Sequence, residues 1–333
     1  MWIAAALSLT IAPSFAFTDL GITSKFDSSE ATYINDEGVI VGTFADNLRQ
    51  FRAFSWKQRV LKVLPKYPGF DSTSATGINN EGIIAINASS EINGAYMGTK
   101  SLALMLDKGK WTPIPPPKGY TDSHINGINN QGVAFGVFDF SSAIPNIDHP
   151  QVQLPEAFIL SRGKLSLLGT GEVMAWNGFN VGVGRLIPTV MTGAGDSFQA
   201  ISWKDGTRSS LSNGAAALGI NDTGLKVGYL AMNGIPVQAV TFTDGKADKL
   251  PTAGSPSCAN AVNLGEDIVG WSVFNGKRLA CIWQDDICYD LNVLVKLPTG
   301  WTLLDARSIN KKGQIVGVAM SPAGQRAFLL TPR

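Results

Sequence analysis

The sequence is poor in charged residues and carries almost no net charge. Charged residues make up 16% of its 333 positions, below the roughly 25% of an average soluble domain, and the formal net charge is +1. A nucleic-acid-binding domain needs a clustered basic face, so we expect no nucleic-acid partner. With three cysteines and two histidines, the chain also offers few soft ligands, and we expect neither a metal nor another cofactor.

The cysteines do not form an even disulfide framework, because Cys258, Cys281 and Cys288 are three in number. Cys281 and Cys288 flank a predicted hairpin and can pair only in a favourable strand register. Free buried thiols are the simpler expectation. His124 and His149 belong to a different part of the repeat series, so they do not complete a zinc site with these cysteines.

Long apolar runs are also missing, apart from residues 1–16. That uncharged stretch is too short to span a membrane and ends in Ser14-Phe15-Ala16, with small residues at the positions typical of a cleavage site. It lacks the usual basic residue at its start. We predict a signal peptide over residues 1–16, a single mature domain over 17–333, and no stable membrane insertion. The expected location is secreted, periplasmic or on the cell surface.

Glycine is abundant, with 36 residues, and it belongs to a repeat. The stretch from Ala31 to Gly42, ATYINDEGVIVG, recurs six times, and each copy centres on an asparagine that we number position 0. Successive asparagines are 44, 50, 48, 44, 42 and 47 residues apart, the spacing of propeller blades or solenoid units. The asparagines are Asn35, Asn79, Asn129, Asn177, Asn221, Asn263 and Asn310.

Two glycine positions recur within the repeat. A glycine at position +3 predicts a tight hairpin turn with a positive φ. Asn180 stands there in the fourth copy and tolerates the same conformation, whereas Glu266 in the sixth copy predicts a different turn. A glycine at position +7 predicts the close approach of another backbone, and only Ile86 in the second copy breaks this rule.

Each copy then continues with a second apolar segment, such as RAFSW at 52–56 or QAISW at 199–203, and one more short strand. Four short strands per unit is the content of a propeller blade. The pattern IN-x-x-G-x-IVG followed by AF-x-W resembles the HAF-repeat family of bacterial extracellular proteins over nearly the whole chain. The resemblance implies a secreted or surface-exposed repeat protein and transfers no catalytic residue.

The strand count predicts how the ring closes. The seventh unit ends at Arg333 without a fourth strand, while the segment from Phe17 to Gly21 precedes the first unit and has no other role. We therefore predict an all-β, seven-bladed β-propeller of four-stranded blades, closed by the N-terminal strand completing the last blade. The alternative, an open solenoid, leaves that strand unexplained.

A binding site is expected on one face of this ring. The connections at 88–100, 139–155 and 187–197 are long, come from consecutive blades and fall on the same face as the crossovers between blades. Three crossovers carry a glycine followed by an aromatic residue, which either plugs the seam between blades or offers a stacking platform. The candidate binding residues are Phe70, Tyr120, Trp301, Tyr96, Asp139, Asp148, His149 and Asp196.

The seven asparagines admit two interpretations: they line an opening on the axis, or each caps its own turn. The second accounts for all seven copies at once.

Three functions remain open from the sequence. The favoured one is an exported, monomeric binding module without catalysis, which recognises a protein or a glycan through the long-loop face. The second is an enzyme acting on an extracellular polysaccharide through loop carboxylates, drawn from Glu91, Asp139, Asp148, Glu156 and Asp196. Their spacing specifies no acid–base pair. The third is a scaffold domain in an envelope assembly.

Overall fold

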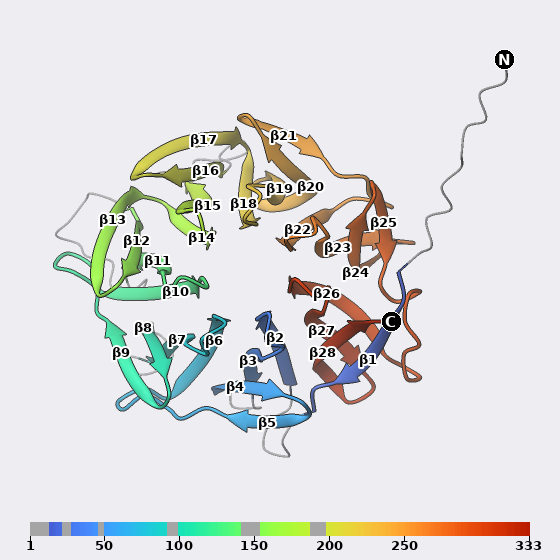
Figure 1. The fold of residues 1–333 in the computed structure, drawn as a ribbon, viewed down its shortest axis with the longest axis horizontal. Coiled ribbons are helices and arrows are strands. Elements are labelled where there is room, and N and C mark those ends of the chain that lie inside the picture. The colour runs from blue at the N-terminus through green and yellow to red at the C-terminus, as the bar shows by residue number, and fades with distance from the viewer. Residues whose placement is uncertain (1–12, 22–27, 46–49, 92–98, 141–153, 187–197) are drawn as a thin grey trace.

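The computed structural model describes residues 13–21, 28–45, 50–91, 99–140, 154–186 and 198–333. In these residues seven four-stranded antiparallel sheets surround a central axis as the blades of a β-propeller (Figure 1). The predicted fold class is confirmed. Six blades run outwards in chain order from an innermost first strand, and in the last blade the N-terminal strand is the outermost one. The described residues contain no helix that is long and apolar enough to cross a membrane.

The first four blades follow one another in sequence order. Blade 1 comprises β2 (Ser28–Ile34), β3 (Ile40–Ala45), β4 (Phe51–Lys57) and β5 (Val60–Val63). Blade 2 comprises β6 (Ser72–Ile78), β7 (Ile84–Glu91), β8 (Thr99–Asp107) and β9 (Lys110–Ile114). Blade 3 comprises β10 (Asp122–Ile128), β11 (Ala134–Asp139), β12 (Glu156–Ser161) and β13 (Lys164–Thr170). Blade 4 comprises β14 (Glu172–Trp176), β15 (Val181–Leu186), β16 (Gln199–Lys204) and β17 (Thr207–Asn213).

The last three blades complete the ring. Blade 5 comprises β18 (Ala215–Ile220), β19 (Lys226–Met232), β20 (Ile235–Thr243) and β21 (Lys246–Lys249). Blade 6 comprises β22 (Ser257–Val262), β23 (Ile268–Phe274), β24 (Lys277–Gln284) and β25 (Ile287–Asp290). Blade 7 comprises β26 (Thr302–Ile309), β27 (Ile315–Ser321), β28 (Gly324–Pro332) and the N-terminal β1 (Phe15–Asp19).

The N-terminal strand closes the ring as predicted, but it begins two residues earlier than expected. β1 pairs antiparallel with β28 from Phe15 opposite Pro332 to Asp19 opposite Phe328. Phe15 is only 3% exposed, because its side chain packs in the core between blades 6 and 7 and its N–H donates to the Leu294 carbonyl oxygen at 3.1 Å. Tertiary packing thus extends the strand into residues that read as leader sequence.

All seven turns after the repeat asparagine have one geometry. The residue at position +3 has a positive φ in every copy, including Asn180 at 58° and Glu266 at 67°. The prediction of a different turn in blade 6 is wrong. The Glu266 N–H donates to the Asn263 carbonyl oxygen at 3.2 Å, the same bond that Gly38 makes to Asn35 in blade 1. The surrounding hydrogen bonds hold Glu266 in a conformation that costs a non-glycine residue about 1 kcal/mol or more.

The position +7 glycines allow a close approach of the innermost two strands, as predicted. A Cβ atom on Gly184 would lie 1.8 Å from the Glu172 carbonyl oxygen, and one on Gly228 would lie 2.0 Å from that of Ala216. The other four glycines at this position are equally close to the facing carbonyl. Blade 2 has the fully buried Ile86 there, so its two innermost strands cannot approach as closely.

Every innermost strand contains a β-bulge that the sequence pattern did not reveal. In each blade the register with the second strand shifts between positions −4 and −2, for example between Ala31 and Tyr33. The residue at position −3 is therefore unpaired in the ladder. Bulges re-aim side chains, and here the bulge decides which residues face the axis.

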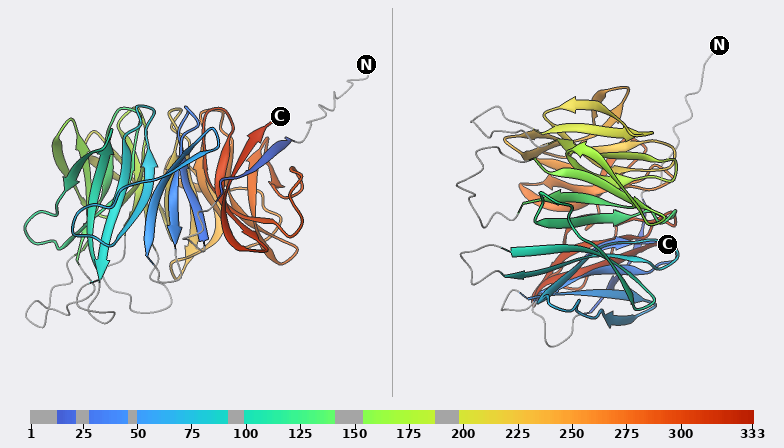
Figure 2. Two further views of the ribbon diagram at one scale, coloured as in Figure 1. Left: turned by 90° about the horizontal axis from the view of Figure 1, so that it is seen from below. Right: turned by 90° about the vertical axis from the view of Figure 1, so that its left-hand side faces the viewer.

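The two faces of the ring differ. The turns at the repeat asparagines and the hairpins between the third and fourth strands lie on one face, which we call the turn face. The crossovers between blades lie on the opposite loop face, as Figure 2 shows from the side. The predicted placement of the crossovers is confirmed.

Candidate functional site

The seven repeat asparagines form a ring of hydrogen bonds around the axis. In each copy the side-chain Oδ1 accepts a hydrogen bond from the backbone N–H four residues later, at 2.8 to 3.0 Å. The interpretation that each asparagine caps its own turn is confirmed. The Nδ2 atom makes a second bond that we did not predict, because it donates to the carbonyl oxygen of the asparagine in the next blade.

Six of the seven links are made, and they join the two ends of the series. Asn310 Nδ2 donates to the Asn35 carbonyl oxygen at 3.0 Å, and Asn221 Nδ2 donates to that of Asn263 at 2.9 Å. The other made links run from Asn35, Asn129, Asn177 and Asn263. Asn79 Nδ2 is buried and has no hydrogen-bond partner in the described part of the chain. The ring is interrupted between blades 2 and 3.

A different contact closes that seam. Asn87 Oδ1 accepts the Ile125 N–H at 2.8 Å, and Asn87 Nδ2 donates to the Ile125 carbonyl oxygen at 3.0 Å. Asn87 follows Ile86, the one exception to the position +7 glycine rule. This contact could have been suspected from the sequence, because Ile86 and Asn87 are two adjacent departures from the repeat pattern in one copy.

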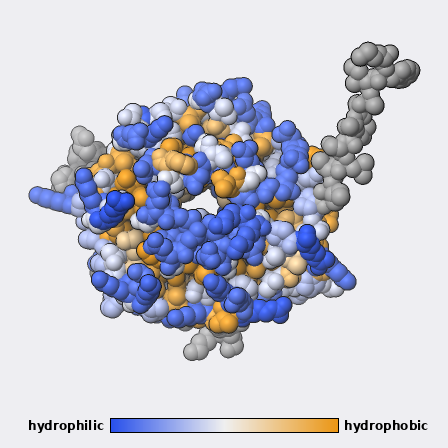
Figure 3. Space-filling model, viewed as in Figure 1, coloured by the Kyte–Doolittle hydropathy of each residue, from blue (hydrophilic) through white to orange (hydrophobic). Residues whose placement is uncertain are grey.

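Inside the ring of asparagines lies an axial cavity of about 350 Å³. Its mouth is on the turn face, where Figure 3 shows a central opening with hydrophilic residues gathered on one side and hydrophobic residues on the other. The wall consists of positions −3 to +1 of the repeat, together with Phe135 on β11. Position −3 supplies the deep layer, with Thr76, Asn126, Met174, Leu218, Asn260 and Arg307.

Several deep polar side chains also tie neighbouring blades together. Thr76 Oγ1 donates to the Ile125 carbonyl oxygen at 3.0 Å, and Asn126 Nδ2 donates to that of Val173 at 2.7 Å. These bonds use one end of each side chain. The Asn126 Oδ1 atom makes no hydrogen bond in the described residues, so it is available to a ligand in the cavity.

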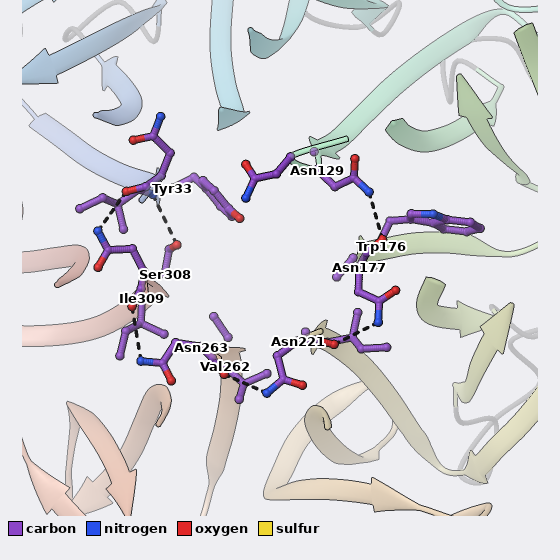
Figure 4. A pocket seen from close by; sticks show the side chains of 18 of the residues that line it. Tyr33, Asn129, Trp176, Asn177, Asn221, Val262, Asn263, Ser308 and Ile309 are labelled. Carbon is purple, nitrogen blue, oxygen red and sulfur yellow. Dashed lines mark hydrogen bonds between the residues drawn. The ribbon is translucent and has the colours of Figure 1, made fainter. Parts of the chain in front are cut away.

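Tyr33 is a large side chain at position −2, one residue closer to the turn face than the deep layer. The other six copies have glycine, alanine or serine at its position, −2. Its ring points into the cavity (Figure 4), 40% of its surface is exposed, and its hydroxyl makes no hydrogen bond in the part of the chain described. Burial in the cavity raises the pKa of this hydroxyl, and the charges of Asp36 and Asp222 raise it further. Both carboxylates therefore act on the Tyr33 hydroxyl and favour its neutral form.

The charges on the cavity wall are unevenly matched. Asp36 accepts hydrogen bonds from Asn80 Nδ2 at 2.9 Å and from the Lys311 N–H at 3.1 Å, and Lys311 Nζ lies 3.6 Å away. Burial raises the pKa of Asp36, but these donors and the Lys311 charge outweigh it and hold the pKa below its ordinary value.

Arg307 lies 3.0 Å from Glu30 and 3.8 Å from Asp305. Burial raises the pKa of Asp305, although Arg278 and Arg307 oppose this shift. Asp222 differs from these paired charges. It accepts the Gly178 N–H at 2.7 Å and has no ion-pair partner among the described residues.

The predicted aromatic residues of the loop face lie in three separate seams. Phe70 packs against the core between blades 1 and 2 and lies 5.9 Å from the Tyr67 ring. Trp301 meets Phe17 edge to face at 5.1 Å. The Tyr120 ring lies 5.0 Å from that of Phe140, and no contact joins any two of the three predicted residues. Each follows a turn in which the glycine has a positive φ, and each is half-buried. This arrangement matches the seam-plugging interpretation.

Asp139 is engaged with His124, whose Nε2 atom lies 3.5 Å from Asp139 Oδ1. Burial lowers the pKa of His124, but the hydrogen bond and charge of Asp139 outweigh it and raise the pKa overall. The Glu156 carboxylate accepts the Gly169 N–H at 3.0 Å. Tyr96, Asp148, His149 and Asp196 lie outside the described residues, as does the side chain of Glu91, so those predictions stand untested.

The cysteines are free thiols, as expected, and Cys258 and Cys281 are buried. Burial raises the pKa of both thiols. The described residues contain no group of three or more His, Cys, Asp or Glu side chains that could hold a metal ion.

Comparison with known proteins supports the fold but assigns the chain to no family. No protein-family model and no curated protein sequence matches the chain. The resemblance to the HAF-repeat family therefore stays a prediction. Solved structures do match: the β-propeller domain of the Trilobed protease from Pyrococcus furiosus, described as having an open velcro topology, has a TM-score of 0.57 at 10% identity, over 93% of this chain and 94% of that one.

Two peptidases share the same ring. The Pyrococcus horikoshii acylaminoacyl peptidase matches with a TM-score of 0.56 at 11% identity, over 93% of this chain and 53% of its own. A Mycobacterium tuberculosis puromycin-hydrolyzing peptidase matches with a TM-score of 0.56 at 9% identity, over 96% of this chain and 54% of its own. The chain spans about half the length of these two enzymes. At such identities the likeness establishes the seven-bladed fold alone.

Proposed function

We propose that the protein is a binding module without catalysis of its own, and that its ligand enters the axial cavity from the turn face. The observation that carries this proposal is the cavity itself. Its volume of about 350 Å³ falls within the range of small-molecule pockets.

The chemistry of the wall supports recognition. A binding pocket combines an apolar surface with a few polar groups that fix the orientation of the ligand. Here Met174, Leu218 and Ile220 supply the apolar surface, while Asn126 Oδ1 and the Tyr33 hydroxyl are polar atoms without a hydrogen-bond partner in the described part of the chain. A side chain of a protein ligand or a small polar molecule fits this description.

The cavity extends the expectation of a loop-face site. The predicted loop-face residues that the structure describes are occupied in packing or ion pairing, whereas Asn126 Oδ1, the Tyr33 hydroxyl and Asp222 Oδ2 in the cavity have no hydrogen-bond partner among the described residues. Binding through the long loops at 92–98, 141–153 and 187–197 remains a separate prediction, because those segments lie outside the described residues.

Export to a secreted, periplasmic or surface location forms part of the proposal, and it rests on residues 1–16. A cut after Ala16 would remove the buried Phe15 from β1. N-terminal sequencing of protein recovered from the culture medium and from the cell envelope tests this point. Recovery of the chain only from the cytosol would contradict export and leave the binding proposal intact.

Methionine methyl groups offer a direct test of ligand entry. Met174 lines the floor of the cavity, whereas Met320 is on β27 and 43% exposed away from it. We would label the methyl groups with ¹³C, assign Met174 from the loss of its signal in Met174→Leu, and titrate small alcohols, amines, carboxylates and sugars. The proposal expects at least one class to shift the Met174 signal while the Met320 signal stays in place.

Two variants make this test sharper. Tyr33→Ala should enlarge the cavity and change the affinity of any ligand that shifts Met174, whereas Tyr67→Ala on the loop face should not. If no probe at millimolar concentration moves the Met174 signal, the axial cavity is not a ligand site and the proposal fails.

A further inference from the structure

We infer that the axial cavity selects ligands carrying a protonated alkylamine, such as a free amine or the side chain of a lysine. This inference rests on the proposed function, since it names the ligand class of the same cavity.

Asp222 is the charge on the cavity wall that has no ion-pair partner among the residues described. Asp36 has Lys311, and Arg307 has Glu30 and Asp305, so those charges cancel locally. Asp222 Oδ1 accepts the Gly178 N–H at 2.7 Å, while its Oδ2 atom has no partner in the described residues. The carboxylate stands at the rim of the cavity and is available to a cation.

Tyr33 offers a second group that can bind a cation, inside the cavity. Its hydroxyl lies within the electrostatic reach of both Asp36 and Asp222, on opposite sides of the mouth. The phenol oxygen can accept a hydrogen bond from an ammonium N–H, and the face of the ring attracts a cation. A cation entering from Asp222 thus meets a second favourable group below the rim.

Apolar residues flank the carboxylate. Phe179 in the turn of blade 4 is 69% exposed, and Leu264 in the turn of blade 6 is 56% exposed. Blade 5, which carries Asp222, stands between them. Hydrophobic residues at this side of the opening are visible in Figure 3. An alkyl chain of a few carbons can lie on these two side chains while its ammonium group reaches Asp222.

The wider turn face agrees with this selection. The seven turns around the mouth carry the acidic residues Asp36, Glu37, Glu81, Asp222, Glu266 and Asp267, against the basic residues Lys311 and Lys312. The net charge of this inner ring is negative, and it attracts cations towards the opening.

Isothermal titration with two matched ligands tests the inference. Pentylamine and 1-pentanol have the same chain and differ in charge. We expect pentylamine to bind more tightly, with an affinity that falls as salt is raised. Asp222→Asn should weaken pentylamine binding roughly five-fold, the effect of one partly exposed charge pair, and should leave pentanol unchanged. The Asn side chain can still accept the Gly178 N–H, so folding should be retained.

A control variant and a second ligand complete the experiment. Asp244→Asn removes an exposed carboxylate from the outer hairpin of the same blade, on the same face but away from the cavity, and should change neither affinity. N-acetyl-lysine-amide separates the sources: tighter binding than pentylamine indicates a peptide side chain, and weaker binding indicates a free amine. Either result supports the shared ammonium chemistry.

Two outcomes distinguish failure of the inference from failure of the proposed function. If pentanol binds as tightly as pentylamine and Asp222→Asn has no effect, the cavity binds ligands without selecting amines, and the inference is overturned. If neither ligand shifts the Met174 methyl signal, the cavity binds neither and the proposed function loses its support as well.

Discussion

Six of the seven seams between blades contain the same asparagine-to-backbone hydrogen bond, and the seventh contains a different pair of hydrogen bonds in its place. At six seams an asparagine at position 0 donates to the backbone of the next blade, as Asn221 does to Asn263. At the seam between blades 2 and 3, Asn79 Nδ2 has no partner in the described residues, and Asn87 instead makes two hydrogen bonds to Ile125.

The difference shows what the ring requires. A backbone carbonyl that is buried between two blades needs a hydrogen-bond donor, so each innermost strand is tied to the next. The seven repeats need not use the same atom to do this. The exception in blade 2 lies beside Ile86, the one residue that breaks the position +7 glycine rule.

The largest effect should come from removing the close strand approach in a regular blade. Gly184→Val places a side chain where the Glu172 carbonyl oxygen would lie 1.8 Å from its Cβ, so we expect a loss of about 3 kcal/mol in the free energy of unfolding. The matched change Ile86→Val in blade 2 should cost only about 1 kcal/mol. Urea unfolding followed by tryptophan fluorescence measures both. Equal losses would show that the two blades pack alike.

The contact between Asn87 and Ile125 should contribute more to the free energy of unfolding than any single asparagine link of the ring. Asn87→Ala leaves the Ile125 N–H buried without a partner, which should cost about 2 kcal/mol. Hydrogen exchange should show faster exchange of the Ile125 amide in particular. Thr43 occupies the equivalent position in blade 1, and its buried hydroxyl has no partner in the described residues. Thr43→Val should be neutral or stabilising, and a large loss there would contradict this account.

Because Asn79 makes no link to the next blade in the described residues, replacing it should destabilise the protein less than replacing an asparagine that does. Asn35→Ala removes both the turn cap and the link to blade 2, whereas Asn79→Ala removes only the cap to the Ile83 N–H. We expect Asn35→Ala to destabilise the protein by about 1 kcal/mol more than Asn79→Ala, the value of one hydrogen bond. Differential scanning calorimetry compares the two. Identical midpoints would indicate that the link from Asn79 forms in solution.

The smallest expected effect is a pH dependence of stability. It distinguishes a seam bridged by a carboxylate, that of Asp36, from a seam bridged by an amide, that of Asn130. Asp36 joins blades 7, 1 and 2, and its lowered pKa means that its ionised form stabilises the fold. This contribution is complete above the ordinary carboxyl pKa, near 4, and is lost as the pH falls through the lower folded-state value.

The stability difference between wild type and Asp36→Asn should therefore narrow between pH 6 and pH 3. Asn130 accepts the Asn80 N–H at 2.9 Å at the next seam, and Asn130→Ala should cost the same at every pH. A difference for Asp36→Asn that stays constant with pH would mean that its lowered pKa has no bearing on stability.

Much of the fold could be predicted from the sequence, because the relevant signals are local. The turn at each repeat asparagine depends on four or five neighbouring residues and on a positive φ, which glycine and Asn180 indicate directly. The number of blades follows from the number of copies, and the closing strand follows from counting strands. Glu266 shows the limit, since its turn forms through surrounding hydrogen bonds that override its own conformational preference.

The candidate site could not be predicted in this way. The bulge in every innermost strand shifts the alternation of side chains by one residue, so a simple period of two does not tell which residues face the axis. Tyr33, Met174 and Arg307 enter the cavity for that reason. The sequence left the loop-face aromatics open between seam plugs and stacking platforms, and packing against the neighbouring blades places them in seams.

The sequence by itself thus determined the repeat, its turns, the seven blades and the strand that closes them, because each depends on short-range patterns. Tertiary structure alone decided the ring of asparagine links, the substitute at Asn87, and the cavity with Asp222, which has no ion-pair partner among the described residues. The physical reason is that these features are contacts between blades. They depend on how closely seven similar sheets approach one axis, and no single repeat contains that information.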